Sequence, residues 1–329
     1  MASRPLPDPL MKLLSDRLSP QAGKSPLIPQ TGEGANARPK PINGVLLLDK
    51  PVGLTSNTAL QKAKRLLNAR KAGHTGTLDP FADGLLPLCF GEATKFSAYL
   101  LDADKAYRAV LQLGITTTTG DPEGEVTATR DVNVSRADVA AVLPRFTGEI
   151  SQIPPMHSAL KHQGRPLYEY ARAGIDIERP PRTVTIRSLE LLECTPPHVV
   201  LDVRCSAGTY IRTLAQDIGA ALGCGAHLTA LTRTASGGFA LGAAHTLDEL
   251  AALDGPERQA LLLPPDCLVA HLPAVRLEET AATALLQGRV VPHAQPDTGL
   301  VRVYSGEAFL GLAEAGPDGL APRRLVATG

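Results

Sequence analysis

The sequence predicts a mixed α/β protein with a smaller β-rich region at its C-terminal end. Short apolar runs that suit buried strands alternate with segments whose apolar residues recur at helical spacing. Beyond about residue 263 the pattern changes to a Pro-Pro pair, a short helix over 278–286 and several strand-like segments. At 329 residues the chain is long enough for one large domain and a small one.

Composition narrows the class of protein. Hydrophobic residues make up 43% of the chain and charged residues 20%, which is typical of a globular protein with a core. No apolar run approaches the roughly 20 residues that a membrane-spanning helix needs, and the N-terminus lacks an apolar segment of signal-peptide type. The five cysteines are scattered and never form a CxxC pair, which favours reduced thiols over disulfides or a zinc site. We therefore expect a cytoplasmic protein with no membrane partner.

The chain begins with a segment that does not look folded. Residues 1–40 are rich in Pro, Gly, Ser and charge, which predicts a mostly disordered extension. Val45 to Leu48 then form an apolar run bounded by Gly and Pro, which predicts a buried strand. Ser56 is placed as an N-cap, and the apolar residues after it recur at helical spacing. Basic residues occupy the remaining surface of this helix and the segment just after it. They form either a solvated face or a phosphate-facing patch.

Lys71 to Lys95 reads KAGHTGTLDPFADGLLPLCFGEATK, and its three glycines and two prolines exclude a continuous helix or a long strand. Asp79 lies at its centre, immediately before Pro80. Because proline restricts the residue before it, the backbone of Asp79 is biased to an extended or turn conformation. A carboxylate on such a stiff loop is a candidate for chemistry; the alternative is an Asp that simply starts a turn.

The middle of the chain predicts four further strands and two helices. The strands are expected over 107–113, 126–129, 183–193 and 199–205, and the helices over 135–146 and 211–222. Ser135 with Asp138 resembles a capping box, and Gly223 suits the C-terminal cap of the second helix. Arg212 lies in the first turn of that helix, where a cation opposes the helix dipole. We expect a compensating anion near it, either a protein carboxylate or a phosphate.

Residues 154–182 depart from a packed pattern. They combine Pro, Gly and His with basic residues and two tyrosines, Tyr168 and Tyr170. A long basic and aromatic loop suits gripping phosphates and stacking on bases, while an exposed linker is the alternative.

Other chemistries have less support. The chain has no GxxxxGK[ST] and no HExxH motif, and its eight histidines show no metal-ligand spacing. Four aspartates could still collect Mg²⁺ for phosphoryl transfer, so a Mg²⁺-dependent phosphatase stays open as an alternative. They are Asp79, Asp83, Asp102 and Asp104.

Six motifs in register resemble the TruB family of tRNA pseudouridine synthases. They are GVLLLDKP (44–51), GHTGTLDPFADGLLPLCFGEATKF (73–96), DKAYRA (104–109), PPMHSALKHQGRPLYEYAR (154–172), CSAGTYIRTLAQDIG (205–219) and GCGAHLTALTRTASG (223–237). The resemblance runs from about Pro41 to Leu250. It implies an α/β pseudouridine synthase domain over 41–263, with a mixed, largely antiparallel sheet flanked by helices and an RNA-gripping insertion at 154–182. Residues 266–329 resemble a PUA-like RNA-binding domain.

The resemblance also implies a reaction and its residues. The family converts uridine to pseudouridine at position 55 in the T-loop of tRNA, without a cofactor or a metal. Asp79 falls on the catalytic carboxylate and Arg212 on its partner arginine, while Tyr107, Tyr210 and Leu231 fall on positions of the uridine pocket. His74 falls on the histidine that enters the RNA where the base has left. Further RNA contacts are expected from Lys50, Lys71, Lys161 and Arg165.

Two considerations bear on the partner. The net charge is zero, which counts against a nucleic-acid binder unless the basic residues are clustered, so the RNA footprint should be confined and salt-sensitive.

A non-catalytic tRNA-binding or folding chaperone of the same fold is the alternative function. Asp79, Tyr107 and Arg212 together argue against it, since binding alone needs no such trio. We expect the protein to bind the T-arm of tRNA and to act as a monomer.

Overall fold

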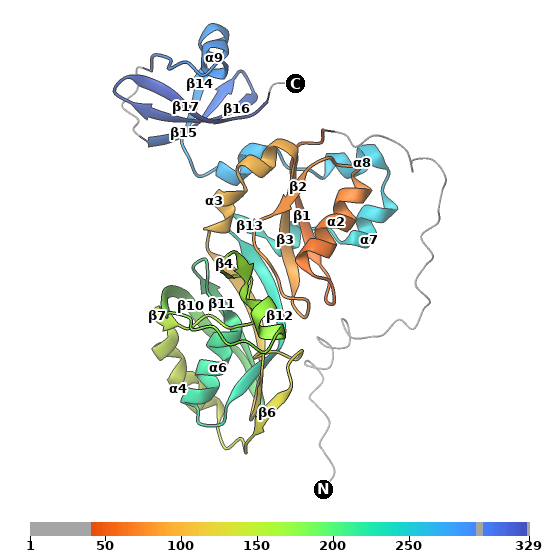
Figure 1. Cartoon of the computed structure of the whole chain (residues 1–329), viewed down its shortest axis with the longest axis vertical. Coiled ribbons are helices and arrows are strands. Elements are labelled where there is room, and N and C mark those ends of the chain that lie inside the picture. Colours follow the sequence, from red (N-terminus) through yellow and green to blue (C-terminus); the bar gives the residue numbers. More distant parts are fainter. Residues whose placement is uncertain (1–40, 294–298, 328–329) are drawn as a thin grey trace. The chain divides into compact units, whose positions relative to one another are not determined.

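The computed structural model describes residues 41–293 and 299–327 (Figure 1). The extension expected over residues 1–40 lies outside the described residues. Within the described ranges, nine strands form one sheet and four strands near the C-terminus form another. Neighbouring strands of the large sheet are antiparallel, apart from β3 and β12, which pair in parallel. The expectation of a mixed, largely antiparallel sheet is therefore confirmed.

Seven strands of the large sheet lie side by side, and two short ones each pair with an inner strand. In spatial order the seven are β1 (Gly44–Lys50), β3 (Asp83–Phe90), β12 (Ala226–Ser236), β4 (Lys105–Leu113), β11 (His198–Cys205), β10 (Arg182–Thr195) and β7 (Gly148–Gln152). The short strands are β2 (Ala72–His74), which pairs with β3, and β13 (Phe239–Ala240), which pairs with β12. Two small hairpins lie outside the sheet: β5 (Ile115–Thr117) with β6 (Val126–Thr129), and β8 (Lys161–His162) with β9 (Arg165–Pro166).

Helices flank this sheet, as expected. They are α2 (Ser56–Leu66), α3 (Ser97–Leu101), α4 (Arg136–Val142), α5 (Leu167–Arg172), α6 (Ile211–Ala221), α7 (Leu247–Ala252) and α8 (Gly255–Ala260). In Figure 1, α2 and α7 lie beside the β1–β3 end, while α4 packs on β10 and α6 packs on β12 and β4. Side chains from α2, α4, α6 and the sheet form one hydrophobic core.

The start of α2 differs by one residue from the prediction. Thr55, not Ser56, is the N-cap, and its hydroxyl accepts a hydrogen bond from the Thr58 backbone N–H at 3.0 Å. Ser56 is the first residue of the helix and is buried. The Ser135–Asp138 capping box of α4 is confirmed.

Strand β3 overturns the expectation that residues 71–95 contain no long strand. The strand has eight residues, and its apolar side chains are buried on both faces, with Leu86 and Leu88 in one hydrophobic cluster and Leu85 in another. Pro87 lies in its middle and costs the sheet one N–H donor, but its carbonyl accepts from the Thr75 N–H at 3.2 Å. Burial of the apolar run outweighs that missing donor.

Helix α6 lies close against β12. A Cβ atom at Gly219 would come within 2.2 Å of the Ala226 backbone nitrogen, so only glycine permits this approach. The helix ends at Ala221 with Leu222 as its C-cap, and Gly223 follows with φ of +80°, the left-handed conformation expected after a C-cap. The position of α6 fixes where Arg212, in its first turn, enters the interior.

The C-terminal part is β-rich, as expected. It contains β14 (Ala274–Leu277), β15 (Gly299–Ser305), β16 (Ala308–Gly316), β17 (Gly319–Leu325) and helix α9 (Glu279–Leu286). These elements share a hydrophobic cluster drawn only from residues 275–325. Among the helices that the structure describes, none is long and apolar enough to cross a membrane.

Candidate active site

Asp79 lies on the loop between β2 and β3, and the neighbouring α2 holds that loop in place. The Ser56 hydroxyl accepts a hydrogen bond from the Leu78 N–H at 2.8 Å and donates one to the Leu78 carbonyl at 3.0 Å. The Ala82 N–H donates to the Asp79 carbonyl at 3.1 Å, which closes a turn after Asp79. The backbone is therefore fixed on both sides of the carboxylate, whose side chain is 35% exposed.

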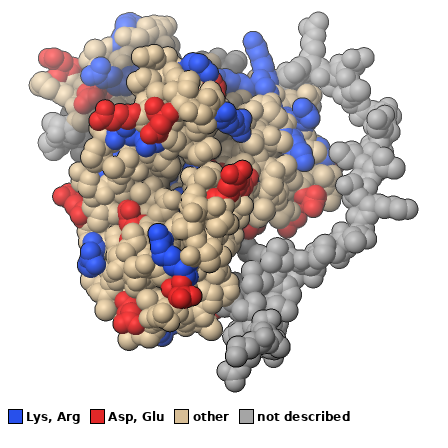
Figure 2. Space-filling model, turned by 60° about the horizontal axis from the view of Figure 1, so that its bottom comes forward, with Lys and Arg blue, Asp and Glu red and all other residues tan. Residues whose placement is uncertain are grey.

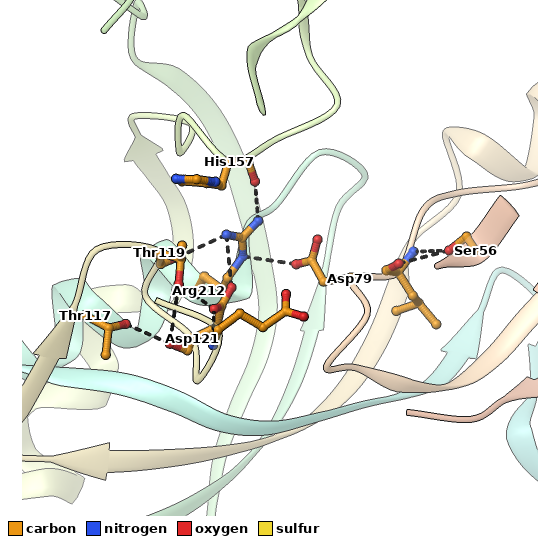
Figure 3. Close-up of polar contacts among 9 residues, drawn as sticks. Ser56, Asp79, Thr117, Thr119, Asp121, His157 and Arg212 are labelled. Carbon is orange, nitrogen blue, oxygen red and sulfur yellow. Dashed lines mark hydrogen bonds and ion pairs between the residues drawn. The ribbon is translucent and has the colours of Figure 1, made fainter. Parts of the chain in front are cut away.

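The Arg212 guanidinium joins four groups from different parts of the chain (Figure 3). Its Nε lies 3.0 Å from Asp79 Oδ2, and its Nη1 lies 3.3 Å from Asp121 Oδ2. Nη1 also donates to the Thr119 carbonyl at 3.1 Å, and Nη2 donates to the His157 carbonyl at 2.6 Å. The side chain is only 5% exposed, so its planar fork is held in a single arrangement. The anion expected near Arg212 is thus a pair of protein carboxylates.

Asp121 is a site residue that the sequence did not reveal. It follows β5 in a run of Thr, Gly and Pro that has an ordinary turn composition, yet its side chain is only 3% exposed. Its Oδ1 accepts hydrogen bonds from the Thr119 hydroxyl and from the Glu123 N–H at 3.0 Å. Asp121 is therefore fixed by its own turn before it meets Arg212, and no local pattern distinguishes such an Asp from a surface turn residue.

Burial and charge act on the Asp79 carboxyl in opposite directions. Burial raises its pKa, the neighbouring Asp121 carboxylate raises it further, and the Arg212 guanidinium lowers it. The net effect is a pKa above the usual value for Asp. An ionised Asp79 in this site is thus a less solvated and more basic carboxylate than one at the surface, and its charge depends on Arg212.

The other predicted pocket residues lie on elements around this loop. Tyr107 lies on β4 and is half-buried, and Leu231 lies on β12 and is 7% exposed. Tyr210 is the N-cap residue of α6, two residues before Arg212. His74 ends β2, and burial lowers its pKa. Asp79 acts electrostatically on Tyr107, whose pKa is raised chiefly by burial.

Arg233 is a second residue that sequence reasoning missed. It lies on β12 opposite Tyr107 of β4 and is 1% exposed. Its Nε donates to the Leu85 carbonyl at 2.7 Å, and its Nη2 donates to the Gly76 carbonyl at 3.2 Å. Since Gly76 precedes Asp79 and Leu85 follows it, Arg233 ties both ends of the Asp79 loop to the sheet.

The expectation that Lys50 contacts RNA is corrected by the structure. Its side chain is fully buried, and its ammonium group donates to the carbonyls of Pro51 at 2.9 Å and Leu54 at 2.8 Å. Burial lowers its pKa to about 8, although the nearby Asp83 and Asp79 raise it. Lys50 therefore organises the turn after β1 from the inside instead of presenting a charge to a ligand.

The three other predicted RNA contacts are at the surface. Lys71, Lys161 and Arg165 are exposed, and Arg165 lies 3.3 Å from Glu169 and 5.0 Å from the Tyr170 ring centroid. On the face drawn in Figure 2, Lys and Arg side chains lie among Asp and Glu side chains. This mixture of charges agrees with the neutral total and shows no single basic patch among the described residues of that face.

The side chains of this site suit acid–base or nucleophilic chemistry. Within residues 41–293 and 299–327, no three His, Cys, Asp or Glu side chains are grouped so that they could hold a metal ion. A partly buried carboxylate can act as a nucleophile or stabilise positive charge that develops on a sugar, and the arginine fixed against it favours its ionised form.

Removing the Ser56 hydroxyl tests the support of this loop. In Ser56→Ala, the buried N–H and carbonyl of Leu78 lose their partner, so we expect unfolding to become easier by about 1–3 kcal/mol. We also expect the catalytic rate constant to fall roughly tenfold or more, because Asp79 is no longer held at one orientation. Thermal unfolding and single-turnover kinetics measure the two effects. Asn57→Ala, an exposed change in the same helix turn, is the control; matching rates in the two variants would contradict this role of Ser56.

Comparisons with protein families cover most of the chain. Residues 64–211 match "TruB family pseudouridylate synthase (N terminal domain)", and residues 212–270 match "tRNA pseudouridylate synthase B C-terminal domain". Residues 273–326 match "Pseudouridine synthase II TruB, C-terminal". The matches meet within α6, between Ile211 and Arg212.

Known proteins resemble the chain over nearly its full length. It is 74% identical to tRNA pseudouridine synthase B of Thiobacillus denitrificans, over 87% of this chain and 97% of the relative. It is 59% identical to the protein of that name from Azoarcus sp., over 87% of this chain and 96% of the relative. A solved structure of an H/ACA RNP bound to a substrate RNA containing 2′-deoxyuridine matches with a TM-score of 0.65 and 28% identity, covering 86% of this chain and 84% of that one.

Proposed function

The chain belongs to the TruB family of pseudouridylate synthases and isomerises uridine to pseudouridine in tRNA, and we propose that its target is the uridine at position 55 in the T-loop, with Asp79 as the catalytic carboxylate. One observation carries the assignment of Asp79: its carboxylate lies 3.0 Å from an arginine that is itself almost fully buried. The relatives named tRNA pseudouridine synthase B support tRNA as the substrate. The T-loop target follows from the family that the motifs around Asp79 resemble.

The reaction needs a carboxylate and a pocket but no redox partner. The bond between N1 of uracil and C1′ of the ribose breaks, and a bond between C5 and C1′ forms. The proton on C5 is lost and N1 gains a proton, so atoms and electrons balance without a cofactor. Asp79 can attack the sugar, attack the base, or remove a proton from the sugar to give a glycal. Each route requires it to be ionised, which the Arg212 charge favours.

The remaining residues have proposed roles around the flipped base. A uridine within folded RNA must leave its stack to reach Asp79. We assign stacking on that base, and help with the proton at C5, to Tyr107, and the walls of the pocket to Tyr210 and Leu231. His74 occupies the place that the base leaves, and its lowered pKa keeps it neutral and therefore suited to insertion among bases.

The outer contacts are proposed for the T-arm of tRNA. Lys71, Lys161 and Arg165 supply exposed positive charge, and the 154–182 segment adds stacked arginine and tyrosine side chains. We divide the chain into a catalytic domain over 41–263 and a PUA-like RNA-binding domain over 266–329. The protein acts as a monomer in the cytoplasm, where its tRNA substrate is made.

Release of tritium from carbon 5 of uridine tests the function directly. The purified protein is incubated in EDTA with an unmodified tRNA transcript labelled at that carbon. We expect about one label to be released per tRNA, because one C5 proton is lost for each pseudouridine formed. A transcript with cytidine at position 55 should release none.

The same assay separates the alternatives. Release from the cytidine-55 transcript would refute position 55 while keeping the synthase assignment. Tight tRNA binding without any release would favour the binding-protein alternative. Activity that is lost in EDTA and restored by Mg²⁺ would instead require a metal that the proposal does not include.

A further inference from the structure

Two residues that the proposed mechanism does not use face each other at the base of the 154–182 segment. Gln152 is the last residue of β7, and Arg182 is the first residue of β10. They are directly opposed partners in the antiparallel ladder between these strands. The segment thus leaves the sheet after Gln152 and returns to it at Arg182, so this pair closes its base.

Gln152 binds the main chain of Tyr210 at two points. Its Nε2 donates to the Tyr210 carbonyl at 3.2 Å, and its Oε1 accepts from the Tyr210 N–H at 3.1 Å. Gln152 is 1% exposed, so water does not compete for these bonds. No capping hydrogen bond from its own side chain holds Tyr210 at the start of α6. The Gln152 amide therefore fixes the main chain of Tyr210 on both its N–H and its carbonyl.

Arg182, on the neighbouring strand β10, contacts the same turn. Its Nη2 donates to the Gly208 carbonyl, and its Cζ lies 4.8 Å from the centroid of the Tyr210 ring. A guanidinium at that distance from an aromatic face is attracted to it and restricts how the ring can move. Gly208 has φ of +81°, which brings its carbonyl to this position in the turn before α6.

A third attachment fixes the beginning of the turn. The Ser206 N–H donates to the Thr185 carbonyl at 2.8 Å, and the Thr185 N–H donates to the Ser206 hydroxyl at 2.9 Å. Residues 206–210 are thus bound at their start by β10, in their middle by Arg182, and at their end by Gln152. The turn has little freedom to move independently of the β7–β10 edge.

We propose that Gln152 and Arg182 are positioning residues for the uridine pocket, which hold the main chain and the ring of Tyr210 in the arrangement that receives the target base. The inference rests on the proposed role of Tyr210 in that pocket. The physical reason is that an aromatic ring at a helix start without a side-chain cap would sample several orientations. Binding the base would then cost the entropy of ordering the ring. If Gln152 and Arg182 fix one orientation beforehand, binding no longer carries that entropy cost.

Two variants test this pair with little change in volume or charge. Gln152→Met removes both hydrogen bonds to Tyr210, and Arg182→Lys keeps the positive charge but loses the planar face over the ring. For each we expect the single-turnover rate at saturating tRNA to fall between about 10-fold and 10²-fold. The Kd for tRNA should change less than about twofold. Gln259→Ala, an exposed change in α8, should leave the rate unchanged.

A double-mutant cycle shows whether Arg182 acts through the ring. In a Tyr210→Ala background the ring is absent, so adding Arg182→Lys should slow the reaction further by less than about twofold. If Arg182→Lys costs as much in that background as in the wild type, the inference is wrong. Arg182 Nε is buried and has no hydrogen-bond partner in the described part of the chain, so a phosphate contact is the rival role. That role predicts that Arg182→Lys weakens tRNA binding, because the planar guanidinium is lost, while the saturated rate and the salt dependence stay unchanged; this result would also overturn the inference.

The outcomes separate this inference from the proposed function. If Tyr210→Ala reacts slowly while Gln152→Met and Arg182→Lys react at the wild-type rate, the positioning role of Gln152 and Arg182 is wrong and the proposed function stands. A wild-type rate in Tyr210→Ala would overturn the role of Tyr210 and the inference together. Should Gln152→Met fail to fold, as judged by thermal unfolding, Arg182→Lys and the cycle decide the question by themselves.

Discussion

Asp79→Asn is expected to fold as the wild type does and to form no measurable pseudouridine. The side chain keeps its shape, so Arg212 retains Asp121 and two carbonyl groups as partners. The amide is neither a nucleophile nor a base, and each route open to Asp79 requires an ionised carboxylate. We expect the single-turnover rate to fall on the order of 10⁴-fold or more. Tritium release from carbon 5 measures it, and the melting temperature checks the fold.

Asp102→Asn is the matched control for this change. Asp102 is exposed at the end of α3, and the same substitution there should leave release of the label at the wild-type rate. Residual activity near wild type in Asp79→Asn would remove the carboxylate from the mechanism. Equal losses in both variants would indicate a general effect of the substitution on folding or on the assay.

Most of the secondary structure was predictable because its signals are local. The apolar spacing of α6, with Gly223 after it, predicted a helix whose first turn carries Arg212, and the structure has that helix. The capping box of α4 was equally visible. Strand β3 was not predictable. Glycine and proline within it argue against a strand locally, and the sequence nearby does not reveal that both faces of the strand are buried.

The candidate site was predictable only in part. Asp79 and Arg212 are 133 positions apart, and their pairing came from the resemblance together with the cation in a helix first turn. Asp121 lies in a turn of ordinary composition, and the groups beside it that bind Arg212 include backbone carbonyls, which every residue has. Lys50 looked like a surface charge because sequence cannot show that its ammonium group is enclosed by the carbonyls of the next turn.

Replacing Arg212 is expected to damage both catalysis and stability. In Arg212→Ala, Asp121 remains buried without its cation, so we expect unfolding to become easier by about 3–5 kcal/mol. Arg212→Lys keeps a positive charge, but one ammonium group cannot reach both carboxylates and both carbonyls at once. The rate should therefore fall on the order of 10²-fold even in the variant that folds best. Denaturant unfolding and single-turnover kinetics at saturating tRNA measure the two losses.

The pH dependence of the rate distinguishes pairing with Asp79 from a purely structural role of Arg212. In the proposed mechanism activity requires ionised Asp79, so the rate should fall as the pH drops through the raised pKa of that carboxyl. Arg212 lowers this pKa and Asp121 raises it. Arg212→Lys keeps the charge but loses the hydrogen bond that favours the ionised carboxylate, so it should move the acid limb of the pH–rate profile to higher pH. Asp121→Asn removes a like charge and should move the limb to lower pH. A structural role would slow both variants without moving the limb, and shifts in the same direction would show that the two charges do not act on Asp79 separately.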